Sequence, residues 1–144
     1  MKFIGNILFF GLSLLVLAQL TTASFLKDDK MTACGGKPNK CPDKVKVVNT
    51  GFDVSPDKVQ LFGARCCSTT QFHLAEQRND PKCNGIWASS KDPDHQCMTS
   101  GTYDDAVAHC AKSNAKLCTC NDLLNKCAKS TGCSLNKEMV WCDP

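Results

Sequence analysis

The chain has 144 residues, and its 17 basic and 14 acidic residues give a formal net charge of +3. No basic run exceeds two residues, so nothing in the charge pattern points to nucleic acid or an anionic membrane as a partner. The 121 residues after position 23 hold all 12 cysteines, a density typical of a disulfide scaffold in an oxidising compartment.

Residues 1–23 form a hydrophobic leader. It opens with Lys2, continues through an apolar run over 7–20 and ends in small residues, as signal peptides do. We expect cleavage after Ala23, with cleavage after Ser24 as the alternative. Loss of Lys2 then leaves 16 basic against 14 acidic residues, a net charge of +2. No second apolar run is long enough to span a membrane, so the sequence predicts a secreted, extracellular protein with no membrane span.

Segment 24–58 is expected to be a cysteine-bounded N-terminal arm that ends in the first strand. Glycine and proline are frequent around Cys34 and Cys41, and no helical or strand period is present there. This predicts an irregular arm that disulfides tie down. Valine then alternates with charged residues over Lys44–Asn49, which predicts a strand.

Segment 59–144 is expected to be the disulfide-rich core, forming a single domain with the arm. Alternating side chains predict a second strand over 59–67, whereas 68–75 fits either a continued strand or a short helix. Proline, glycine, serine and acidic residues are frequent over 79–102, which predicts a long loop. A final strand is expected over 139–142.

Two short helices are predicted by capping boxes. Thr102, followed three residues later by Asp105, starts the first helix, and Asn114 is a suitable left-handed terminator. Thr119, followed by Asp122, starts the second. These elements predict an α+β fold: a small disulfide-rich domain with two short helices packed on a small antiparallel sheet, and long loops.

The cysteines are expected to form five or six structural disulfides. Adjacent Cys66 and Cys67 point to opposite faces if they lie in a strand, so each should bind a different neighbour. If Cys120 and Cys127 are both helical, they lie about 10 Å apart along the axis, beyond the roughly 7 Å limit between Cα atoms for a bridge. The expected disulfide residues are Cys34, Cys41, Cys66, Cys67, Cys83, Cys97, Cys110, Cys118, Cys120, Cys127, Cys133 and Cys142.

No pattern typical of catalysis is present. Cys118 and Cys120 are separated by one residue, whereas thiol oxidoreductases use two, and the secretory route opposes the reduced thiolates that zinc needs. The serines form no nucleophile elbow, and His109 is expected to be a solvated side chain on the first helix. We therefore expect no enzyme, no metal and no cofactor.

The loop over 80–94 and the residue that follows it carry the candidate binding residues, which are Trp87, Asp92, Asp94 and His95. An aromatic face among polar groups suits a sugar ring or a protein partner. The alternative is that Trp87 packs over a disulfide. The spacing of the aspartates matches no calcium loop.

Two resemblances follow from residues 65–141. The sequence Thr102 to Cys110, with the later Leu117, resembles the first helix and following strand of C-type-lectin-like and link modules. The wider pattern resembles a small cysteine-rich extracellular module, and it consists of Arg65-Cys66-Cys67-Ser68, Tyr103 to Cys110, Leu117-Cys118-Thr119, Gly132-Cys133 and Val140-Trp141. The first resemblance implies a shared local structure, and no calcium or sugar ligand carries over from it. The second implies an extracellular domain.

Three functions remain open at the level of sequence. We favour a secreted, non-catalytic recognition or extracellular-matrix module whose rigid loops bind an extracellular carbohydrate or protein. A toxin, defence peptide or hydrolase inhibitor is the alternative, because disulfide density also protects against proteases. A lipid carrier is third, since a cysteine doublet followed by Cys-x-Cys occurs in plant lipid-transfer proteins; here three further cysteines interrupt that interval.

Overall fold

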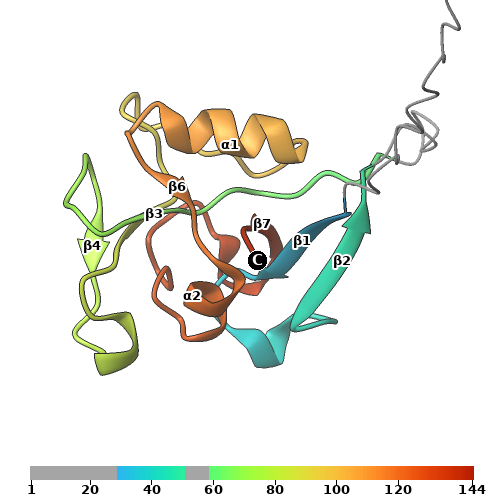
Figure 1. Cartoon of the computed structure of the whole chain (residues 1–144), viewed down its shortest axis with the longest axis horizontal. Helices are drawn as coiled ribbons and strands as arrows, with labels where there is room; N and C mark the ends of the chain where they lie inside the picture. The colour runs from blue at the N-terminus through green and yellow to red at the C-terminus, as the bar shows by residue number, and fades with distance from the viewer. Residues whose placement is uncertain (1–28, 51–58) are drawn as a thin grey trace, which may run out of the picture.

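The structure is a computed structural model that describes residues 29–50 and 59–144. The expected signal peptide over 1–23 lies outside these residues. The described chain forms two small antiparallel sheets and two short α-helices (Figure 1). The expected α+β class is therefore confirmed, and the strands divide between two sheets rather than one.

The first sheet joins the N-terminal arm to the C-terminus. Its strands, in the order β2-β1-β7, are β1 (Asp29–Cys34), β2 (Val45–Asn49) and β7 (Met139–Cys142), and both pairings are antiparallel. Strands β2 and β7 lie where the sequence predicts them. The prediction of an irregular arm is wrong for β1, because β7, from the far end of the chain, pairs with it and helps bury Ala33 and Cys34.

The second sheet has four very short strands. In the order β4-β5-β3-β6 they are β4 (Glu76–Gln77), β5 (Trp87–Ser89), β3 (Cys66–Ser68) and β6 (Lys116–Leu117). The strand predicted over 59–67 is wrong for most of its length, since regular pairing begins only at Cys66. The predicted loop over 79–102 contains β5, which pairs on both sides.

The two helices are α1 (Tyr103–Ala111) and α2 (Cys120–Leu124). Each has the expected capping box: the N-cap hydroxyl accepts a hydrogen bond from the backbone N–H three residues later, at 3.2 Å for Thr102 and 3.0 Å for Thr119. Asn114 has a φ of 52°, as expected for a left-handed terminator. Local sequence alone therefore sets where both helices start.

All twelve cysteines are paired. The six bridges are Cys34–Cys41, Cys66–Cys110, Cys67–Cys118, Cys83–Cys127, Cys97–Cys133 and Cys120–Cys142. The doublet Cys66-Cys67 does bind two different neighbours, as expected. Cys120 and Cys127 also have separate partners, but Cys127 lies beyond the end of α2, so the argument from helix geometry does not apply to this pair. Each bridge typically contributes about 2–4 kcal/mol to stability, and six of them indicate an oxidising environment.

Trp141 lies at the centre of one of the two hydrophobic clusters. Its ring is fully buried and meets the rings of Phe62 and Tyr103 edge to face, with centroids 4.9 and 5.7 Å away. Its indole N–H donates to the Gly101 carbonyl at 2.8 Å. Among the described helices, none is long and apolar enough to cross a membrane.

Candidate functional site

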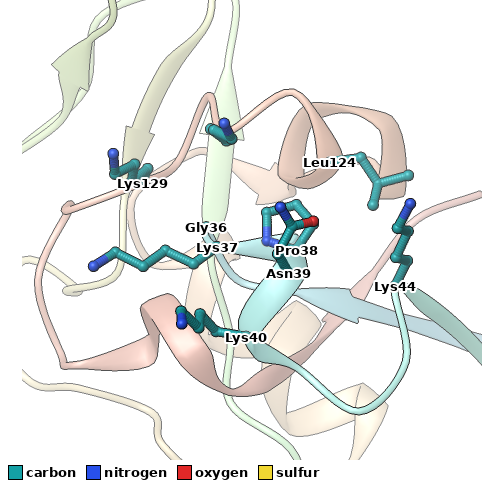
Figure 2. A pocket seen from close by; sticks show the side chains of 9 residues that line it. Gly36, Lys37, Pro38, Asn39, Lys40, Lys44, Leu124 and Lys129 are labelled. Carbon is teal, nitrogen blue, oxygen red and sulfur yellow. The ribbon is translucent and has the colours of Figure 1, made fainter.

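A pocket of about 580 Å³ lies between the N-terminal arm and the segment that follows α2. Figure 2 shows most of its side chains as labelled sticks. Its lining residues are Gly36, Lys37, Pro38, Asn39, Lys40, Lys44, Leu124, Lys126 and Lys129. Five of these nine residues are lysines, so we call it the lysine pocket.

The first wall is a short loop closed by a disulfide. The Cys34–Cys41 bridge joins the end of β1 to the residue after the 3-10 turn η1 (Pro38–Lys40), and thus constrains the segment that carries Lys37 and Lys40. Proline in the first position of η1 suits this turn, because its φ is fixed and it needs no hydrogen-bond partner for its nitrogen. The arm reaches Lys44, whose carbonyl accepts from the Cys34 N–H at 3.2 Å.

The second wall begins at the C-terminal end of α2. Leu124 is the last helical residue, and Lys126 turns the chain with a φ of 67°. The Cys83–Cys127 bridge then fixes the next residue to η3 (Pro81–Cys83). The chain continues to Lys129, which completes this wall of the pocket.

A buried arginine supports the second wall from behind. Arg65 is fully buried and donates to the Ala128 carbonyl, to the Thr131 hydroxyl at 2.7 Å and to the Asn136 side-chain oxygen at 3.1 Å. Burial, and to a smaller extent the positive charge of Arg78, lowers the pKa of Arg65 to about 10. A guanidinium with that pKa stays charged at neutral pH, so these charge-assisted hydrogen bonds hold the loop in place.

Glycine at position 36 lets the two walls approach each other. A Cβ atom there would lie 2.8 Å from the side-chain oxygen of Asn136 and 3.0 Å from the Cα atom of Lys129. Contacts below about 3 Å require the neighbour to move, and a backbone atom cannot move cheaply. The arm therefore packs against Lys129 only because Gly36 has no side chain.

The charge of the pocket has one sign. Among the described residues, no aspartate or glutamate lines it. Within the described chain, none of the five lysine ammonium groups has an ion-pair or hydrogen-bond partner. Like charges gathered around a concave surface raise the local concentration of anions, so this pocket is suited to a ligand with negative groups.

In two other hollows of the described chain, a carboxylate lies in the lining or pairs with its lysine. One of about 480 Å³ beside β6 has Lys116 together with Asp122 and Asp143 in its lining. Another, of about 400 Å³, includes Lys112, whose ammonium group lies 3.0 Å from the Asp92 carboxylate. The lysine pocket differs from both because its charges are not compensated.

The candidate residue Asp92 is buried and not available at the surface. Its carboxylate accepts hydrogen bonds from the Lys112 ammonium at 3.0 Å and from the backbone N–H groups of Asp94 and Gln96 at 3.1 and 2.9 Å. The hydrogen bond from Lys112 is the main reason why the pKa of Asp92 lies below its ordinary value. Asp92 therefore organises the turn from within.

His109 also differs from its expected place. We expected a solvated side chain, but the residue is 7% exposed. One ring nitrogen lies 3.3 Å from the Ser90 carbonyl, and the other is 4.0 Å from the Asp92 carboxylate. The prediction was wrong because the chain over 90–92 folds back onto α1, which no helical pattern in the sequence reveals.

The other three candidate residues lie on or near the same turn. Trp87 is half-buried in β5, where it pairs with Ser68 and Gln77. Asp94 and His95 are exposed, and the His95 ring lies 5.7 Å from the His73 ring. The structure thus brings Asp92, Asp94 and His95 into one turn, and none of the four candidates lines the lysine pocket.

Sequence reasoning missed the lysine pocket because its charges come from separate segments. The only local signal is that Lys37, Lys40 and Lys44 recur within eight residues, as do Lys126 and Lys129 within four. Residues 45–125, with six other lysines, separate these groups. Only pairing of β1 with β7 and packing of α2 on β1 bring the groups together.

No protein-family model, curated protein or solved structure matches this chain. No family match therefore supports the resemblance to C-type-lectin-like and link modules or to a cysteine-rich extracellular module. What the fold itself defines is the class of small α+β domains, here with six disulfides.

Proposed function

We propose that this protein is a secreted, non-catalytic recognition module that binds an acidic extracellular carbohydrate or protein in its lysine pocket. The observation that carries the proposal is the gathering of five lysines around one concave surface; among the described residues, none pairs with these lysines and no carboxylate lines the surface. Disulfides and the buried Arg65 brace both walls. The backbone of both walls is therefore preorganised, so it loses little conformational freedom when a ligand binds.

The proposal moves the binding site away from the turn that holds Trp87. Asp92 is already engaged with Lys112, and none of the remaining candidates lines the lysine pocket. Trp87, Asp94 and His95 stay a predicted site for a carbohydrate or protein. The variant Trp87→Ala separates the two sites, because an acidic ligand held in the lysine pocket should bind it with unchanged affinity.

The test compares two variants with the same net charge. Lys37→Gln, Lys40→Gln and Lys44→Gln together remove three charges from the pocket, while Lys46→Gln, Lys91→Gln and Lys116→Gln remove three charges from elsewhere. Each partly exposed ion pair contributes about 0.5 kcal/mol, so the pocket variant should bind an acidic polysaccharide about tenfold more weakly. Calorimetric titration measures this difference.

Salt provides the second readout. The Debye length falls from about 8 Å at 0.15 M to about 3 Å at 1 M salt, so the affinity of the wild-type protein should fall steeply over this range. The pocket variant should show a weaker dependence. Equal loss of affinity in both triple variants would mean that overall charge, and not the pocket, attracts the ligand.

A further inference from the structure

Resting on the proposed function, we infer that the ligand is a sulfated polysaccharide that lies across the lysine pocket and meets lysines on both walls. Three features carry this inference: the kind of cation in the pocket, the distribution of the charges and the nature of the uncharged surface between them.

The cations are all ammonium groups. The chain has two arginines, Arg65 and Arg78, and both use their guanidinium groups on backbone carbonyls, those of Ala128 and Lys129. A planar guanidinium donates two parallel hydrogen bonds to a carboxylate or to a tetrahedral oxyanion, whereas an ammonium acts as a point charge with three donors. Lysines therefore select a ligand by its charge density, which is higher in a sulfated polysaccharide than in one whose only charges are carboxylates.

The charges surround the pocket instead of meeting at one point. In Figure 2, Lys37 and Lys129 lie on one side of Pro38, and Lys44 lies on the other. One small anion cannot reach all of these groups. A linear polymer with repeated charges can engage several at once, and the linked contacts raise its overall affinity.

The surface between the lysines suits a sugar chain better than a nucleic acid. Pro38 and Leu124 are half-buried apolar residues, and Asn39 offers an exposed side-chain amide. Sites for sugars and other small ligands combine apolar surface with a few polar groups. No aromatic residue of 29–50 or 59–144 lines the pocket, whereas single-stranded nucleic acids are commonly held by bases stacked on aromatic rings.

The test measures binding to four polyanions at about 0.15 M salt. These are heparin, the same polymer after chemical desulfation, hyaluronan, whose only charges are carboxylates, and a single-stranded oligothymidine. We expect heparin to bind at least tenfold more tightly than each of the other three. We also expect the variant with Lys37→Gln, Lys40→Gln and Lys44→Gln to lose most of this preference, and the triple variant of Lys46, Lys91 and Lys116 to keep it.

A conservative variant adds a specificity readout. Lys37→Arg, Lys40→Arg and Lys44→Arg together keep the charge and add guanidinium forks. Heparin affinity should persist, because the charge is kept and a guanidinium also pairs with tetrahedral oxyanions, and heparin should still bind at least tenfold more tightly than hyaluronan. Loss of heparin binding in this variant would contradict selection by charge. Folding is not at risk, because these side chains are exposed.

The outcomes separate this inference from the proposed function. If hyaluronan or desulfated polymer binds as tightly as heparin through the same lysines, sulfate specificity is wrong and the lysine pocket remains the binding site. If oligothymidine binds more tightly than heparin, the inference that the ligand is a polysaccharide is wrong as well. If no acidic polymer binds, or if the two triple variants behave alike, the proposed function fails as well.

Discussion

Arg65 stabilises the loop behind the lysine pocket without a carboxylate partner in the described part of the chain. A buried charge is usually paired, since transfer of an ion from water is expensive. Here two oxygens of neutral side chains and one backbone carbonyl replace water around the guanidinium, and its Nε atom has no partner. The lowered pKa of Arg65 reflects that incomplete compensation.

We predict that Arg65→Met lowers the free energy of unfolding by about 2 kcal/mol, because hydrogen bonds to a charged group contribute about 1.5–3 kcal/mol. The effect stays moderate since two of the acceptors keep another donor: the Thr131 hydroxyl for Ala128 and the Ser130 N–H for Asn136. Urea unfolding with the disulfides intact measures it. Arg78→Met is the control, since the Arg78 side chain is 33% exposed; equal effects of the two substitutions would contradict the anchoring role of Arg65.

At the scale of elements, local chemistry predicted the helices but not all the strands. Both helices begin at the threonine expected from its capping box, because capping depends on residues only three positions apart. Strand β1 was missed, because its burial depends on β7 at the other end of the chain. The short strand β5 was missed for a similar reason: it is held between β3 and β4, and its three residues show no period.

We predict that Thr119→Ala and Thr102→Ala each lower the free energy of unfolding by about 1 kcal/mol, since each substitution removes an N-cap. Only Thr119→Ala should also weaken binding of an acidic polysaccharide, because α2 carries Leu124 into the lysine pocket and α1 contributes no residue to it. Urea unfolding and calorimetric titration of the two variants measure both effects. An equal loss of affinity in Thr102→Ala would argue against a specific role of α2.

At the scale of the whole molecule, the sequence pattern predicts the disulfide bonding of the cysteines but does not predict the lysine pocket. The number of cysteines predicted five or six bridges, and strand geometry predicted separate partners for the adjacent Cys66 and Cys67. The lysine pocket was not predictable, because its charges come from two ends of the chain that only the tertiary fold joins. The composition of the loop around Trp87 instead predicts a binding site there.

The most direct test of the lysine pocket is an NMR titration of the ¹⁵N-labelled, disulfide-bonded protein with a heparin-derived oligosaccharide. We predict that amide shifts concentrate in 36–44 and 124–129, and that both sets titrate with the same dissociation constant. Shifts centred on Trp87, Asp94 and His95, or shifts spread over all exposed lysines, would contradict the account.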